Sequence, residues 1–453
     1  MLRRCLVANR GEIAVRIIRA CRELGIESVA VHSTADRDAM HVRMADRAVQ
    51  IGPPAAVDSY LRVDRLVSAA LTTGCDSIHP GYGFLAESTA LVEACAEHDL
   101  VWIGPSAEVI ETMGDKALAK DTMRAAGLPL VPGSAGRLAG PDEALVVAEQ
   151  AGYPVLLKAA AGGGGKGMRL VHRPEDLRDA FLAASAEAEA AFSDSGMYLE
   201  KAVINAHHVE IQVMGDGKGG GLILGERECS IQRRHQKLIE ESPSPFLAAE
   251  TRATMMEAAR AAVESLKYAG AGTIEFLVGD DQSFYFMEMN TRLQVEHPVT
   301  EVVAGFDLVQ AQLLVAGGEG LPDWDGRTAN GHAIEFRINA EDPLHGFRPG
   351  PGRIERFRPP LGPGIRIDTF VEDGSTVPPF YDSMIAKLIV HAPTRDAALA
   401  RAARALDELV IDGIPTTSAL LREIVDEPNF RAGTYTTTYL TEVGDTLTML
   451  GEG

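Results

Sequence analysis

Apolar and polar positions follow a strand–helix–strand order at the start of the chain. Residues 5–8 form a short apolar run that predicts a buried strand, and apolar side chains at helical spacing follow over residues 13–24. Residues 28–32 predict a second strand, so this order indicates a parallel sheet with a right-handed crossover. The first turn lacks the Gly-x-Gly-x-x-Gly pattern of dinucleotide-binding proteins. Further apolar segments that extend the sheet lie at 48–51, 77–79 and 100–104.

Two alternating segments in the middle of the chain predict a β-hairpin. They are residues 273–278 and 284–290, and the residues between them are typical of a turn. Period-two alternation directs Glu275, Glu288 and Asn290 to one face. Two carboxylates and an amide oxygen suit a hard cation such as Mg²⁺ that carries nucleotide phosphates. The alternative is a hairpin with a solvated acidic face.

The alternation continues beyond this hairpin. Arg292, Gln294 and Glu296 recur at period two, and Pro298 is expected to block a helix immediately afterwards. A guanidinium and a carboxylate beside a metal can bind a small anion and move a proton. A structural ion pair is the alternative.

The segment 226–237 is dense in charge, which is typical of a solvated edge strand. At period two, however, Arg233, His235 and Lys237 share a face, and this face would form an anion-binding wall in an otherwise acidic protein.

A glycine-rich run follows a predicted strand that ends at Lys158. Four glycines, at 162–165, precede Lys166. Glycines let backbone N–H groups approach phosphate oxygens, and a mobile loop can close as a lid. No Ser or Thr follows Lys166, so the run is not a P-loop. We interpret it as a phosphate-contacting loop, with a flexible hairpin tip as the alternative.

Three domains are predicted. Residues 1–114 form the parallel-sheet α/β domain, and residues 115–330 form the central domain, which includes a mobile lid at about 131–203. The last domain, 331–453, opens with an alternating strand and ends with helices, as a small α+β module does.

Composition and charge narrow the function classes. The chain has 453 residues, with 43 Lys and Arg against 64 Asp and Glu, a net charge of −21. This charge argues against non-specific binding to nucleic acid or to an anionic membrane. The five cysteines are widely spaced, which indicates reduced thiols. With no signal peptide or long apolar run, we expect a cytoplasmic protein.

Several motifs together resemble the biotin carboxylase component of biotin-dependent acyl-CoA carboxylases, a member of the ATP-grasp superfamily. The resemblance runs nearly end to end and implies an ATP-grasp fold with a Rossmann-like N-terminal domain and a C-terminal α+β domain. The motifs that carry it are ANRGEIA at 8–14, HPGYGFL at 79–85, MGDK at 113–116, the glycine run, QRRHQK at 232–237, EMNTRLQVEHP at 288–298 and RINAEDP at 337–343.

The resemblance implies a role for each matching residue. ATP would be held by Lys116, Lys158, Gly164, Gly165, Glu200, Lys201, Val203, His208, Gln232, His235, Glu275 and Glu288. The implied metal ligands are Glu275, Glu288 and Asn290, and the implied bicarbonate residues are Lys237, Arg292, Gln294 and Val295. The implied catalytic residues are Lys237, Arg292, Glu296 and Arg337, with Glu296 as the general base. Arg337 and Tyr82 would contact biotin.

The implied reaction is ATP-dependent carboxylation of biotin by bicarbonate through carboxyphosphate. It requires ATP and Mg²⁺ or Mn²⁺, with two ions expected, and biotin on a carrier, since no Met-Lys-Met attachment motif is present. The implied partners are a biotin carboxyl carrier protein, carboxyltransferase subunits and a second copy of the chain. We expect acetyl-CoA as the final acceptor, with propionyl-CoA, methylcrotonyl-CoA or pyruvate as alternatives. The competing classes are another ATP-grasp ligase, such as a purine-biosynthetic carboxylase or a carbamoyl-phosphate synthase half, and a non-catalytic ATP-binding regulatory subunit.

Overall fold

The computed structural model describes residues 1–159, 168–192, 194–234, 236–324, 326 and 329–450. These residues form two compact units. The first comprises Met1–Leu128, His207–Phe276 and Glu288–Gly453, and the second comprises Pro129–Ala206 and Leu277–Met287. The predicted boundaries at 114 and 330 do not separate these units, so the three-domain division stays a prediction.

The N-terminal part of the first unit is the parallel sheet that the sequence predicts. Its strand order is β3-β2-β1-β4-β5, and all four neighbouring pairs are parallel. Leu6 lies between Val29 and Ile78 in register, and all three side chains are buried, as expected for a strand covered on both faces. The strands are β1 (Arg4–Val7), β2 (Glu27–Ser33), β3 (Arg47–Gly52), β4 (Ser77–His79) and β5 (Val101–Trp102). The helices here are α1 (Gly11–Glu23), α2 (Met40–Met44), α3 (Val63–Thr73), α4 (Thr89–Glu97), α5 (Ala107–Gly114) and α6 (Lys116–Ala125).

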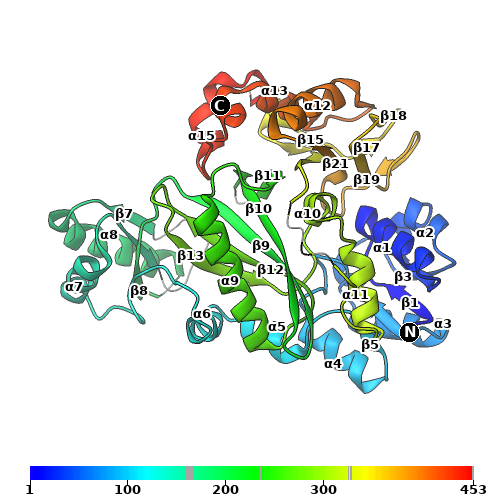
Figure 1. Ribbon diagram of the computed structural model, residues 1–453, viewed down its shortest axis with the longest axis horizontal. Helices are drawn as coiled ribbons and strands as arrows, with labels where there is room; N and C mark the ends of the chain where they lie inside the picture. The colour runs from blue at the N-terminus through cyan, green and yellow to red at the C-terminus, as the bar shows by residue number, and fades with distance from the viewer. Residues whose placement is uncertain (160–167, 193, 235, 325, 327–328, 451–453) are drawn as a thin grey trace. The chain divides into compact units, whose positions relative to one another are not determined.

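A large sheet follows, with strand order β13-β12-β9-β10-β11-β14-β21-β19. Every pair from β9 to β19 is antiparallel, and α9 (Ala249–Leu266) packs on β9 and β10 (Figure 1). The strands are β9 (His207–Asp216), β10 (Gly221–Arg233), β11 (Gln236–Ser242), β12 (Ala269–Val278), β13 (Phe284–Asn290), β14 (His332–Asn339), β19 (Ile365–Thr369) and β21 (Met384–Ala392). The parallel and antiparallel sheets confirm the predicted mixture of α/β and α+β architecture.

The large sheet continues across the predicted domain boundary at 330. Strand β11 precedes this boundary and β14 follows it, yet they pair directly, with Glu240 opposite Glu335. Lys237 on β11 and Arg337 on β14 therefore lie on neighbouring strands. The remaining elements of the C-terminal part are three two-stranded sheets and helices that include α12 (Arg395–Glu408) and α13 (Ser418–Asp426), which share a buried apolar core with β14 and β21.

Two sequence predictions about local structure are wrong. The segment 226–237 is a hairpin instead of a solvated edge strand, because the chain turns at Arg234, where φ is 49°. Arg233 and Lys237 thus lie on different strands, and His235 lies outside the described residues. Pro298 does not block a helix, since α10 (His297–Ala304) begins one residue before it. Proline is tolerated in the first turn because its missing N–H has no partner there anyway.

The second unit contains a small antiparallel sheet of order β7-β6-β8, with helices α7 (Pro141–Ala151) and α8 (Pro174–Phe192). Buried apolar side chains such as Leu157 and Leu199 form its core. The strands are β6 (Val155–Ala159), β7 (Met168–Val171) and β8 (Met197–Lys201). The glycine run at 162–165 lies outside the described residues.

Among the described residues, no single helix combines the length and apolar character needed to cross a membrane. Helices α10 and α11 (Leu308–Ala316) together have that length and composition, but they are bent by 94° to one another.

Candidate active site

Lys237 lies among three carboxylates of the first unit. Its ammonium donates hydrogen bonds to Glu210 at 2.6 Å, Glu275 at 3.0 Å and Glu296 at 2.6 Å. Burial disfavours the charged lysine, but Glu210 and Glu296 outweigh this effect and raise its pKa well above the ordinary value. One fixed positive charge therefore holds three acidic side chains together. Glu210 has a second partner on its other oxygen, the fully buried Arg227 at 2.5 Å.

Glu296 is held from two sides. One oxygen accepts from Lys237, and the other accepts from Arg337 Nη2 at 2.9 Å. Burial favours the neutral acid, yet the charges of Lys237 and Arg337 keep the pKa of Glu296 well below its usual value. Glu296 is thus an ionised carboxylate that can accept a proton. Arg337 reaches it because β14 pairs with β11, and it also donates through Nε to Glu240 at 2.6 Å.

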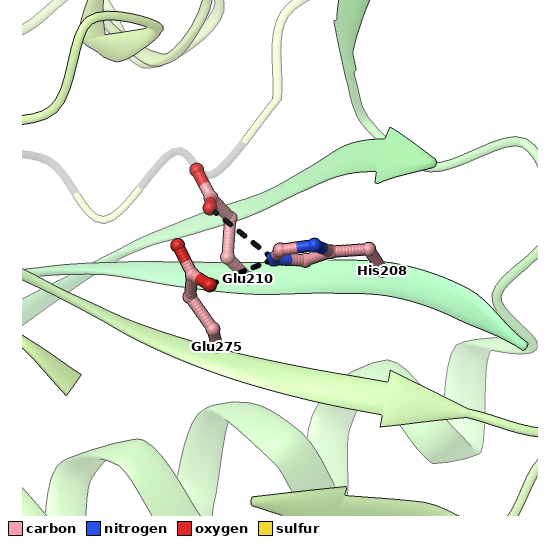
Figure 2. A group of neighbouring side chains, drawn as sticks. All are labelled: His208, Glu210 and Glu275. Carbon is pink, nitrogen blue, oxygen red and sulfur yellow. Dashed lines mark ion pairs between the residues drawn. The ribbon is translucent and has the colours of Figure 1, made fainter. Parts of the chain in front are cut away.

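Figure 2 shows His208, Glu210 and Glu275 converging from neighbouring strands. Their ligand atoms lie within 4.8 Å of one another, and His208 Nε2 is 3.0 Å from Glu275. Lys237 already hydrogen-bonds to both glutamates, so its ammonium occupies the place that a cation would take in this group. His208 is buried in this group, and its Nδ1 also contacts Gln232 at 2.7 Å.

The residues predicted for the metal are partly brought together. Asn290 donates to Glu275 at 2.9 Å, and its oxygen accepts from Arg292 at 3.2 Å. Glu288 is exposed, and partial desolvation together with the charge of Glu275 raises its pKa. Two carboxylates that repel each other at the edge of a buried site are a suitable donor set for a hard divalent cation. Glu275 and Glu288 therefore offer oxygens of the kind that Mg²⁺ prefers, although the oxygens of both Glu275 and Asn290 have partners within the chain.

The predicted bicarbonate residues surround this carboxylate group. Arg292 donates from Nη1 to Gln294 at 3.2 Å, and Gln294 donates to Glu275 at 3.3 Å. The carbonyl of Val295 accepts from the buried Lys387 at 2.8 Å. Guanidinium and amide groups in this arrangement can bind a small planar anion.

The structure adds Glu87, which sequence reasoning missed. It accepts from Arg292 Nε at 2.9 Å and from the backbone N–H of Thr291 at 3.1 Å, so it fixes the direction of the guanidinium. Its signal in the sequence was its position two residues after the HPGYGFL motif at 79–85.

Tyr82 lies in the loop that follows β4. Asn9 ties this loop down by donating to the carbonyls of Pro80 at 2.7 Å and Tyr82 at 2.8 Å. The tyrosine hydroxyl donates to Glu12, which also pairs with Lys387 at 3.1 Å. The ANRGEIA motif at 8–14 and the HPGYGFL motif at 79–85 therefore meet at this loop.

The other predicted ATP residues are distributed over both units. In the second unit, Lys158 pairs with Glu200, and Lys201 donates to the carbonyls of Gly152 at 2.8 Å and Tyr153 at 2.9 Å. Val203 follows β8, and Lys116 begins α6 in the first unit. Gly164, Gly165 and His235 lie outside the described residues.

Three family models match the chain. They are the biotin carboxylase N-terminal domain over residues 1–110, the ATP-binding domain of the carbamoyl-phosphate synthase L chain over residues 115–324, and the biotin carboxylase C-terminal domain over residues 335–442. Biotin carboxylase from Nostoc sp. is 53% identical over 439 residues, 97% of this chain and 98% of the relative. The chain belongs to the biotin carboxylase family. It is accordingly an ATP-dependent ligase of the biotin-dependent carboxylases.

Other members of the biotin carboxylase family differ in name. Biotin carboxylase 1 from Bacillus subtilis is 52% identical over 97% of this chain and 98% of its own length. A pyruvate carboxylase component from Methanothermobacter thermautotrophicus is 50% identical over 98% of this chain and 90% of its own length. The biotin carboxylase domain dimer of 2-oxoglutarate carboxylase from Hydrogenobacter thermophilus, solved with MgADP, ADP and bicarbonate, is 47% identical with a TM-score of 0.87 and covers 99% of both chains.

Proposed function

We propose that this chain catalyses the first half-reaction of an acetyl-CoA carboxylase. ATP and bicarbonate form carboxyphosphate, and its carboxyl group is transferred to biotin on a carrier protein or domain. The observation that carries the proposal is the series Lys237–Glu296–Arg337, in which the buried carboxylate of Glu296 lies between two cations. It combines an anion-binding ammonium, an ionised proton acceptor and a guanidinium that can face a developing negative charge.

Bicarbonate activation uses Lys237 and Glu296 of this series. Lys237, Arg292, Gln294 and the backbone at Val295 hold bicarbonate, and Glu296 accepts the proton of its hydroxyl group. The resulting oxyanion attacks the γ-phosphorus of ATP, so an O–P bond forms and ADP leaves. Lys237 contacts Glu296 at 2.6 Å, which keeps the acceptor ionised until the proton arrives.

Biotin carboxylation uses Arg337, the third residue of the series. Carboxyphosphate separates into CO₂ and phosphate, and phosphate takes the proton from the ureido nitrogen of biotin. Arg337 stabilises the negative oxygen of the biotin enolate while the nitrogen forms its bond to CO₂. Tyr82 lines the biotin pocket.

Nucleotide and metal are held by the remaining predicted residues. Glu275 and Glu288 would hold Mg²⁺ or Mn²⁺, which neutralises phosphate charge when bound. We also propose that Asn290 contributes a metal ligand and that two ions bind. The nucleotide residues are Lys116, Lys158, Gly164, Gly165, Glu200, Lys201, Val203, His208, Gln232 and His235.

The proposal also names acetyl-CoA as the final acceptor of the carboxyl group. Free-standing proteins named biotin carboxylase match this chain along nearly their whole length, which supports the acetyl-CoA type. A pyruvate or 2-oxoglutarate acceptor is the second candidate, because relatives of those names are about as similar. The carboxyltransferase selects the acceptor, and both it and the carrier protein are proposed partners.

Phosphate release from ATP in bicarbonate buffer, with and without free biotin, tests the activity. We expect release to depend on bicarbonate and to be stimulated by biotin, with carboxybiotin formed in parallel. Biotin-independent release without any carboxybiotin would overturn the proposal. Adding purified carrier and carboxyltransferase pairs of the acetyl-CoA and pyruvate types then distinguishes the acceptors.

A further inference from the structure

Two buried glutamates next to Arg337 have no role in the reaction described above. Glu240 on β11 and Glu335 on β14 are cross-strand partners, so their side chains lie on the same face of the sheet. Both side chains are 0% exposed. Glu240 accepts from Arg337 Nε at 2.6 Å, and Glu335 is two residues from Arg337 on the same strand and face.

Three of the four carboxyl oxygens lack a hydrogen-bond partner among the described residues. They are Oε2 of Glu240 and both oxygens of Glu335. A buried carboxylate without a partner is costly, and two such charges side by side are more so. A proton between the two groups removes this cost, because a neutral carboxylic acid on Glu335 can donate to the free oxygen of Glu240.

We propose that Glu240 and Glu335 share one proton behind Arg337, and that this proton keeps the positive potential of the guanidinium available to biotin. The inference rests on the proposed function, in which Arg337 stabilises the biotin enolate. Arg337 already faces the negative charges of Glu240 and Glu296. A third negative charge on Glu335 would repel the enolate oxygen that Arg337 has to stabilise. Glu240 and Glu335 are thus positioning residues that act through Arg337.

The charges around the pair agree with this assignment. Burial and the neighbouring charge of Glu296 raise the pKa of Glu240 to about 7. Burial and the charge of Glu240 raise the pKa of Glu335 well above its usual value, although Lys387 opposes the shift. The pair is therefore protonated at neutral pH and loses its proton as the pH rises. The charged or titratable groups that face it are Arg337 on β14, Lys237 on β11, Lys387 on β21, Glu296 before α10, and Tyr82 with its partner Glu12.

Infrared difference spectroscopy tests the proton directly, since a protonated carboxyl has a C=O stretch that carboxylates lack. At neutral pH we expect this band in the wild-type protein and its loss in both Glu335→Gln and Glu240→Gln. In Glu240→Gln the carboxyl of Glu335 no longer faces a carboxylate, and the positive charges of Lys387 and Arg337 then favour its ionised form. Glu226→Gln is the matched control, because Glu226 is 2% exposed and pairs with Arg252 at 2.5 Å outside the site. A band that survives in either test variant would overturn the shared proton.

The ratio of carboxybiotin formation to biotin-independent phosphate release tests the consequence for catalysis. In the wild type this ratio should decline at alkaline pH as the pair loses its proton. Glu335→Gln mimics the neutral acid, so it should keep the neutral-pH ratio and hold it to a higher pH than the wild type does. Glu240→Gln should lower the ratio by about tenfold, because Arg337 loses its charged anchor. An unchanged alkaline decline in Glu335→Gln would overturn the proposed role. If the wild type forms no carboxybiotin, the proposed function fails, and the infrared result still decides the proton.

Discussion

At the scale of single residues, the site is a problem of charge compensation. Lys237 and Arg337 neutralise a group of buried glutamates that would otherwise repel one another. The motifs in the sequence located these two cations and Glu296. They did not locate Glu210 or Glu240, because the environment of a carboxylate depends on which strands pair, and strand pairing is not encoded in local spacing.

Arg337 and Glu296 should separate the two stages of the reaction. Arg337→Ala should keep biotin-independent phosphate release, because Arg337 acts after carboxyphosphate forms, and should reduce carboxybiotin formation by about 10²-fold. Glu296→Ala should lose both activities, since proton removal from bicarbonate comes first. Parallel assays of phosphate release and carboxybiotin formation measure both effects. Equal losses of both activities in Arg337→Ala would assign this arginine to bicarbonate or ATP instead.

Glu288 provides a test of the metal site. Glu288→Gln removes one charged ligand, so ATP turnover should fall several-fold and the Mg²⁺ concentration needed for tight ADP binding should rise. Calorimetric titration of ADP at varied Mg²⁺ measures the second effect without turnover. Asp281→Asn is the matched control, because Asp281 is an exposed carboxylate at the tip of the same hairpin. Wild-type Mg²⁺ dependence in Glu288→Gln would remove this residue from the metal site.

At the scale of elements, local pattern predicted most strands and helices but not the turn that divides segment 226–237. The hairpin of β12 and β13 and helix α6 lie where alternation and helical spacing placed them. Segment 226–237 was predicted wrongly because Glu226 and Arg227 are buried with partners on other elements, so charge did not mark solvent exposure. The turn at Arg234 divides that segment, and the pairing of Arg233 with Gln236 shows where it lies.

Glu241 should make the junction of β11, β14 and the C-terminal helices sensitive to acid. Burial opposes its ionisation, but hydrogen bonds from His332 and Arg395 outweigh this effect and lower its pKa from 4.5 to about 2. The ionised form therefore stabilises the fold by about 3 kcal/mol at neutral pH, and this contribution is lost as the pH falls from about 5 toward 2.

Urea unfolding of Glu241→Gln measures that contribution. The variant should have a free energy of unfolding about 3 kcal/mol below wild type at neutral pH, and the difference should shrink on acidification. Glu264→Gln, at an exposed position on α9, should unfold as the wild type does at each pH. A difference that stays constant with pH would show that the Glu241 carboxylate is not the acid-sensitive group.

At the scale of the whole molecule, composition and motifs predicted the class of fold and the family. They could not predict that one sheet runs from β9 to β19 through the expected boundary at 330. That boundary followed from a polar, proline-containing stretch, and such a stretch is also compatible with a long connection between two strands of one sheet.

Assembly gives a prediction at this scale. The family resemblance implies that Arg19 and Glu23 match positions of a homodimer contact, and both are exposed in the single chain. Arg366 also matches, although here it pairs with Asp368 at 2.7 Å and Glu301 at 2.7 Å within its own chain. We expect a homodimer at micromolar concentration by light scattering. Arg19→Glu should shift it toward monomer through like-charge repulsion, and a monomeric wild type would contradict the prediction.

The direct pairing of β11 with β14 restricts how this protein can be divided or recombined. A truncation at residue 330 would remove β14 and leave the backbone N–H and C=O groups of β11 as an open edge, which favours self-association. It would also take Arg337 away from Glu296. Chimeras that exchange the C-terminal part between relatives therefore need β11 and β14 from one parent, even though a long stretch of chain separates the two strands.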